Sequence, residues 1–138
     1  MTKPISIALI ALAFSATALL YAEDRMRTGL WEVITTVNGK PSGVTGVTCY
    51  TPAMVQLGNS PASTFKENTE KSLTARNCTL KDFKLEGNKL SMTMVCGARA
   101  STTSSTFTGD AFETTGTSTT AGVSTVTHMK GRRVGDCK

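Results

Sequence analysis

Residues 78–96, CTLKDFKLEGNKLSMTMVC, have the pattern of a β-hairpin with a cysteine at each end. Apolar and polar residues alternate along both arms. Between the arms lies Gly87-Asn88, the glycine-first pair that a two-residue type II′ turn requires. Such a turn pairs apolar residues across the two strands: Leu85 with Leu90, and Phe83 with Met92. The stretch therefore predicts two antiparallel strands that share one apolar face.

The sequence on both sides of this hairpin predicts further short strands. Residues 30–37 are rich in β-branched side chains, and residues 101–127 consist mostly of Ser, Thr and Gly with regularly spaced turn residues. The expected strands are residues 30–37, 44–50, 101–108, 111–119 and 124–130, with turns at Asn38-Gly39-Lys40-Pro41, Gly109-Asp110 and Ala121-Gly122. The fold class is therefore all-β: a single antiparallel meander of about seven short strands, forming a curved sheet or a small barrel.

One short helix is expected between the second strand and the hairpin. It begins at Pro52, with Thr51 as its N-cap, and ends at Leu57 before Gly58. Residues 58–72 are polar and lack a clear period, so they are interpreted as a mobile loop. A helix over residues 65–73 is the alternative for this segment.

The first 22 residues have the layout of a signal peptide. Lys3 precedes an apolar run over residues 5–20, and Ala22 offers a small residue at a cleavage site, with Ala18 as a second choice. A retained membrane anchor or an amphipathic helix is the alternative interpretation. Residues 23–138 then form one β domain, and membrane contact is expected only through the signal peptide before cleavage.

The cysteines predict two disulfides. An exported chain with four cysteines allows three pairings of Cys49, Cys78, Cys96 and Cys137. The hairpin register places Cys78 and Cys96 on opposite faces, so we predict Cys49–Cys78 and Cys96–Cys137. A β-bulge would change this pairing. A metal site is the rival interpretation, but the sequence has no CxxC pair.

Several short motifs together resemble a known family. They are GLWEV at residues 29–33, CYTP at 49–52, Cys78, GNKLS at 87–91 leading to Cys96, and GRRVGDC at 131–137. This pattern is similar to the secreted bacterial domain-of-unknown-function family 3617. The resemblance implies export to the bacterial periplasm and a small β fold. It implies no activity, because no catalytic residues are established for the family.

Charge and aromatic content argue against nucleic-acid binding. The net charge is +5 at pH 7, but the basic residues are spread along the chain, and there are only one Trp, two Tyr and five Phe for base stacking. The exception is a basic segment with Lys130, Arg132 and Arg133. It is a candidate for anion binding, and a solvated loop is the alternative.

The residues that could carry chemistry are few. His128 is the only histidine and has no partner at a recognisable spacing, so no catalytic residue is assigned and no cofactor is expected. A candidate Cu(I) site combines Met92, Met94, His128 and Met129. The alternative is that Met92 and Met94 are core residues.

These observations predict a non-catalytic binding protein of the cell envelope. Its partner would be an envelope protein or a small apolar ligand held by the curved sheet or the barrel mouth. Two other hypotheses are a hydrolytic or metal-dependent enzyme centred on His128, and a structural envelope or stress protein without a ligand.

Overall fold

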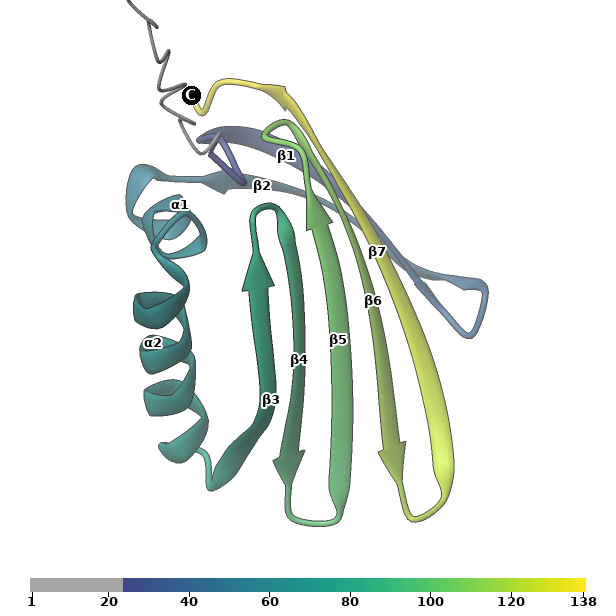
Figure 1. Ribbon diagram of the computed structural model, residues 1–138. Helices are drawn as coiled ribbons and strands as arrows, with labels where there is room; N and C mark the ends of the chain where they lie inside the picture. The colour runs from purple at the N-terminus through teal and green to yellow at the C-terminus, as the bar shows by residue number, and fades with distance from the viewer. Residues whose placement is uncertain (1–23) are drawn as a thin grey trace, which may run out of the picture.

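The computed structural model describes residues 24–138, with only the backbone of residues 43–45. These residues form one seven-stranded antiparallel sheet and two helices (Figure 1). The strands are β1 (Gly29–Val37), β2 (Lys40–Tyr50), β3 (Cys78–Glu86), β4 (Lys89–Cys96), β5 (Arg99–Phe107), β6 (Ala111–Thr120) and β7 (Val123–Gly135). The helices, α1 (Pro52–Gly58) and α2 (Ala62–Thr74), lie between β2 and β3 in the chain. The proposed signal peptide, residues 1–22, lies outside the described residues.

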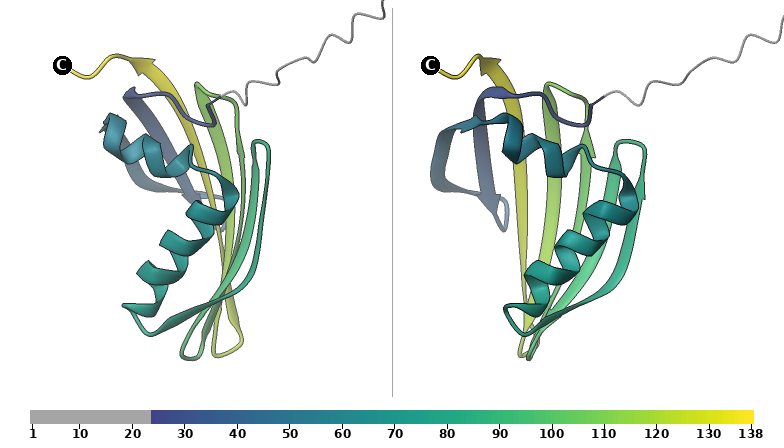
Figure 2. Two further views of the ribbon diagram at one scale, coloured as in Figure 1. Left: turned by 60° about the vertical axis from the view of Figure 1, so that its left-hand side comes forward. Right: turned by 90° about the vertical axis from the view of Figure 1, so that its left-hand side faces the viewer.

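The predicted all-β antiparallel fold is confirmed, with one difference in strand order. The order across the sheet is β2-β1-β7-β6-β5-β4-β3, so β3 to β7 form a meander and the β1–β2 hairpin is added beside β7. Strands β2 and β3 are therefore the two edges, and the sheet is curved but open. The helical segment connects these edges and lies on the concave side of the sheet (Figure 2).

Three of the four turns lie where the sequence predicts them, but the first is shorter than the predicted turn over residues 38–41, because β2 begins at Lys40 and not at residue 44. Gly87-Asn88 is a two-residue turn between Glu86 and Lys89, and Leu85 pairs with Leu90 and Phe83 with Met92. Gly87 has a φ of 56°, the left-handed value that a type II′ turn needs at its first central position. The other predicted turns also connect paired strands: Val37 with Lys40, Phe107 with Phe112, and Thr120 with Val123.

The expected mobile loop over residues 58–72 is wrong, because α2 occupies most of it. Two exposed ion pairs spaced four residues apart, Lys66–Glu70 at 2.6 Å and Lys71–Glu67 at 2.7 Å, support this helix. The Phe65 ring stacks on the Phe83 ring of β3, with the two ring centroids 5.9 Å apart. Leu73, in the last turn of α2, is buried. Tertiary packing on β3 thus stabilises a helix whose own apolar stripe is sparse. The other helix, α1, matches its predicted position after Thr51.

All four cysteines form disulfides, but the predicted pairing is wrong. The bonds are Cys49–Cys137, with the Cα atoms 5.5 Å apart, and Cys78–Cys96, with the Cα atoms 4.3 Å apart. The register of β3 against β4 shifts between Leu80 and Asp82. This irregularity adds one residue to β3 and so moves Cys78 to the face of Cys96, directly opposite it.

The largest buried side chain, that of Trp31, lies at one end of the concave face. Trp31 is fully buried; its ring stacks on Phe112 and meets Tyr50 edge-on, with centroids 5.8 Å away in each case. Phe112 in turn covers Gly131, its partner on β7. We call this the closed end of the sheet. The other end, near the β4–β5 and β6–β7 turns and the last turn of α2, is the open end.

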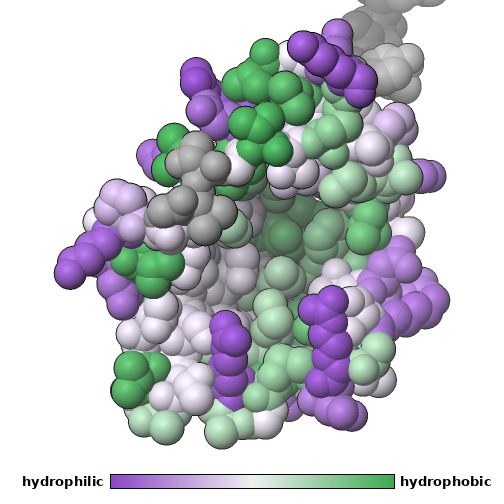
Figure 3. All heavy atoms as spheres, turned by 180° about the vertical axis from the view of Figure 1, so that it is seen from behind, coloured by the Kyte–Doolittle hydropathy of each residue, from purple (hydrophilic) through white to green (hydrophobic). Residues whose placement is uncertain are grey.

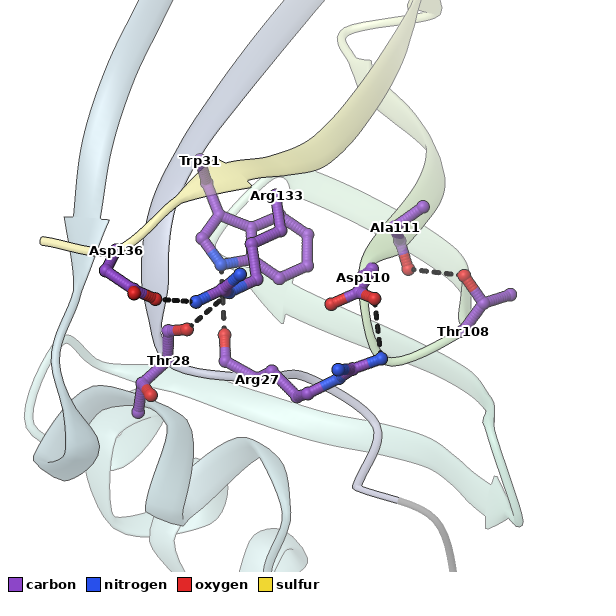
Figure 4. A network of polar contacts seen from close by, with 8 residues as sticks. All are labelled: Arg27, Thr28, Trp31, Thr108, Asp110, Ala111, Arg133 and Asp136. Atoms are coloured by element: carbon purple, nitrogen blue, oxygen red, sulfur yellow. Dashed lines mark hydrogen bonds and ion pairs between the residues drawn. The ribbon is translucent and has the colours of Figure 1, made fainter.

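Residues 24–28, the N-terminal segment, cross the closed end. The Arg25 guanidinium donates to the carbonyls of Gly58 (2.6 Å), Ser60 and Gly87 (3.3 Å), and burial lowers its pKa below the usual value. Arg27 forms an ion pair of 2.5 Å with Asp110, and its carbonyl accepts the Trp31 indole N–H (Figure 4). This segment therefore ties the helices, two turns and the Trp31 core together.

Candidate binding cavity

The side chains on the concave face change character along the strands. On β5 they run from Phe107 at the closed end through Ser105, Thr103 and Ser101 to Arg99 at the open end. On β6 the facing series runs from Phe112 through Thr114, Gly116 and Ser118 to Thr120. Because alternate residues face one side of a strand, a single face passes from aromatic to small hydroxyl side chains. Seen from behind, the molecule is hollowed at its centre, with hydrophobic side chains deep in the hollow (Figure 3).

A cavity of about 350 Å³ lies at the open end, between the sheet and the end of α2. Its walls combine Leu73 and Arg76 from the helical side with residues from β3 to β7. A second hollow of about 300 Å³ shares Arg99, Ser118 and Thr127 with it, so the two adjoin on one surface. The volume is within the range of small-molecule sites, at the lower end.

Serine hydroxyls and one arginine form the polar part of the cavity floor. Arg99 Nε donates to Ser118 Oγ at 2.7 Å, and Ser101 Oγ donates to the same oxygen at 3.2 Å. The terminal nitrogens of Arg99 have no hydrogen-bond or ion-pair partner in the part of the chain that the structure describes. The same holds for the whole side chain of Arg76. Neither hollow has an acidic residue among its described lining, so the surface is electropositive.

The apolar part of the cavity comes from α2 and the hairpin. Leu73 is 8% exposed, and Met94 and the Cys78–Cys96 disulfide are half-buried beside it. This disulfide forms because the irregularity in β3 places Cys78 opposite Cys96. The same irregularity that makes the predicted pairing wrong therefore also places the disulfide in the cavity wall.

Gly116 leaves space in the middle of the floor. A Cβ atom built on Gly116 would have no atom within 4 Å, apart from its chain neighbours, and its φ is not left-handed. A side chain added at this position would extend into the cavity without backbone strain. Gly116 therefore gives direct experimental access to the cavity volume.

The structure does not bring the proposed Cu(I) ligands together. Met92 and Met94 face the concave side from β4, whereas His128 is exposed on the convex side of β7. Met129, next in sequence, faces the concave side. Strands β5 and β6 separate β4 from β7. Within residues 24–138, no group of three or more His, Cys, Asp or Glu side chains has the arrangement of a metal site.

His128 has only a hydroxyl partner. Its Nδ1 lies 3.1 Å from Thr115 Oγ1, the residue that faces it on β6. The hydrogen bonds and ion pairs of the described chain join no carboxylate to this imidazole. This is the arrangement of a surface cross-strand pair.

The basic segment near the C-terminus does not form an open cationic patch. Lys130 pairs with Glu113 at 3.0 Å, Arg132 with Glu32 at 2.6 Å, and Arg133 with Asp136. Arg133 Nε also donates to the Thr28 carbonyl at 2.7 Å. The sequence interpretation missed Arg76 and Arg99, which lie in the cavity. The turn after Cys96 was the available signal for Arg99, because a two-residue turn there places Arg99 opposite Cys96.

The fold and the cavity define a class: small, disulfide-bonded proteins with an open curved antiparallel sheet and a hollow concave face. Residues 26–137 match the family described as protein of unknown function (DUF3617), and the chain belongs to that family. The resemblance seen in the sequence motifs is thus confirmed. No curated protein and no solved structure matches the chain. Among the described residues, neither helix is long and apolar enough to cross a membrane.

Proposed function

We propose that this protein is a non-catalytic binding protein that holds a small ligand in the cavity at its open end. The observation that carries the proposal is the open volume of about 350 Å³ on a face with apolar side chains. The apolar side chains that line it include Leu73 and Met94, beside the small hydroxyl residues of β5 and β6. Concave, partly apolar surfaces with a few polar groups are the usual form of small-molecule sites.

The proposal includes export to the periplasm, with cleavage of the signal peptide after Ala22. Two disulfides support it, since such bonds persist in oxidising compartments. Fractionation of cells that produce the full-length chain, followed by N-terminal sequencing, tests this part. A mature N-terminus at Glu23 in the periplasmic fraction is expected. A protein that remains in the cytoplasm with its first 22 residues would contradict it.

The absence of catalysis is part of the same proposal. The exposed imidazole of His128 lies on the convex side, away from the cavity, with a threonine hydroxyl as its partner. General acid–base chemistry needs such a group within reach of a bound substrate. We therefore expect that a His128→Ala variant binds ligand as the parent does.

The cavity can be tested with an uncharged apolar dye. N-phenyl-1-naphthylamine is titrated into the oxidised protein, exported from its full-length chain, and its fluorescence is followed. We expect saturable binding with one dye per protein. A Gly116→Phe variant should bind at least tenfold more weakly, because the ring occupies the cavity. A Ser104→Phe variant, with its ring on the convex side of β5, should bind like the parent.

Two results would overturn the binding function: no saturable binding by the parent protein, or equal binding by the Gly116→Phe variant. Thr103→Phe adds a ring from β5 to the same cavity and replaces Gly116→Phe if that variant does not fold. Circular dichroism and thermal unfolding show which variants are folded.

A further inference from the structure

We propose that the ligand is an amphiphilic anion: a carboxylate or phosphate head group bound by Arg99 and Arg76, with an apolar chain against Leu73 and Met94. This inference rests on the proposed binding function and adds the chemistry of the ligand. The inference is argued from the described arginines: it compares those whose guanidinium groups contact carboxylates or carbonyls of the protein with those that do not.

The structure describes six arginines, and four of them have strong acceptors within the protein. Arg25 donates to backbone carbonyls, while Arg27, Arg132 and Arg133 form ion pairs with carboxylates. The two others, Arg76 and Arg99, have neither a carbonyl nor a carboxylate acceptor among residues 24–138. Both line the cavity of about 350 Å³.

The orientation of Arg99 suits anion binding. Its Nε donates to Ser118 Oγ at 2.7 Å, and Ser118 is also held by Ser101. This contact holds the guanidinium against β6 and leaves its two terminal nitrogens for a ligand. A guanidinium fork binds carboxylate or phosphate oxygens through charge-assisted hydrogen bonds, with less ordering cost when it is already positioned. No described acidic side chain in the lining competes for it.

The walls beside the arginines account for the apolar part of the ligand. Leu73, Met94 and the Cys78–Cys96 disulfide offer apolar surface in the same cavity. An inorganic anion would leave this surface in contact with water. An uncharged apolar ligand would leave two arginines without a counter-charge. A molecule with both an anionic head and an apolar chain satisfies both parts of the site.

The test compares four probes by isothermal titration calorimetry in 150 mM NaCl, below their micelle concentrations. Decanoate and decyl phosphate carry the two possible head groups, 1-decanol has the chain alone, and inorganic phosphate has the charge alone. We expect decanoate or decyl phosphate to bind at least tenfold more tightly than 1-decanol, and inorganic phosphate not to bind. The difference between decanoate and decyl phosphate identifies the preferred head group.

Arginine variants assign this preference to the cavity. Arg99→Gln should weaken binding of the preferred anion at least tenfold and leave 1-decanol binding unchanged, and Arg76→Gln should have a smaller effect in the same direction. Arg99→Lys should recover part of the affinity, since it keeps the charge but loses the fork. Arg132→Gln is the matched control, because Arg132 pairs with Glu32 on the convex side, and it should bind like the parent.

The inference is overturned if 1-decanol binds as tightly as the anions, if Arg99→Gln binds them like the parent, or if none of the amphiphiles binds. Inorganic phosphate binding as tightly as decyl phosphate would refute the role of the apolar chain. Saturable binding of N-phenyl-1-naphthylamine that is lost in Gly116→Phe would still support the binding function in each of these cases. The two proposals can therefore fail separately.

Discussion

Two glycines on neighbouring strands show how differently the two ends of the sheet are built. Gly131 on β7 and Gly116 on β6 both face the concave side. A Cβ atom on Gly131 would lie 2.1 Å from Phe112 Cε1, whereas one on Gly116 would have open space around it. At the closed end the Phe112 ring packs directly against the Gly131 backbone. At the open end the space above Gly116 is empty.

The difference follows from a few side chains on an otherwise regular ladder. At the closed end, Trp31, Phe107 and Phe112 bring three aromatic rings together. At the open end, the facing residues of β5 and β6 are Ser101 and Ser118, whose side chains are small hydroxyls. The Phe112 ring lies over the bare backbone of Gly131, while small polar residues at the open end leave room for another molecule. Stability and binding are therefore expected to respond to mutation at opposite ends.

The largest effect is expected from the disulfide that joins β2 to the C-terminus near the closed end. Cys49→Ser with Cys137→Ser opens a loop with a sequence separation of 88 residues. Loop entropy then predicts a loss of about 4–5 kcal/mol in the free energy of unfolding, measured by urea denaturation. The matched control is Cys78→Ser with Cys96→Ser, which opens a separation of 18 and should cost about 3 kcal/mol. A larger loss in the control would contradict the loop argument.

Trp31→Ala should be the next most damaging change. It removes the fully buried ring that contacts Tyr50 and Phe112. Large-to-small core substitutions of this kind cost about 3–5 kcal/mol. Urea denaturation followed by far-UV circular dichroism measures the loss, since the variant has no tryptophan. A loss below about 1 kcal/mol would show that the closed end does not carry the core.

The two glycines give the sharpest comparison. Gly131→Ala should lower the free energy of unfolding by about 1–3 kcal/mol, because its methyl group must displace the Phe112 ring. Gly116→Ala should be neutral or raise it by up to about 1 kcal/mol, because the site is open and the unfolded chain loses freedom. Thermal unfolding of both variants measures the difference. A similar loss of stability in both variants would contradict the conclusion that only the closed end is tightly packed.

The smallest expected effect concerns α2, one wall of the open end. The hydrogen bond and charge of Lys71 hold the pKa of the exposed Glu67 carboxyl below its usual value. A depressed pKa in the folded state contributes stability above the unfolded-state pKa, which is lost as the pH falls through the folded-state pKa. Glu67→Gln should therefore lower the melting temperature slightly at pH 7 and leave it unchanged near pH 2. Equal shifts at both pH values would contradict a charge effect.

Much of the site could not be predicted from sequence for identifiable reasons. The helix α2 has few apolar residues, Phe65 and Leu73 among them, and its packing on β3 supplies the stability that its local pattern lacks. Arg76 and Arg99 look like ordinary surface cations in the sequence. Arg99 has Cys96 and Thr120 as its cross-strand neighbours, whereas Arg132 has Glu32, and this difference is a property of the assembled sheet.

The sequence by itself determined the turns, the alternation of the strands, the all-β class and the family, because a two-residue turn and a period of two are local properties of the backbone. The tertiary structure decided the disulfide pairing, since one extra residue between Leu80 and Asp82 reverses the face of Cys78 without a local signature. It also decided the cavity. An unfilled volume depends on how β2 and β3, the two edges, are bridged by helices that lie far from most of the sheet in sequence.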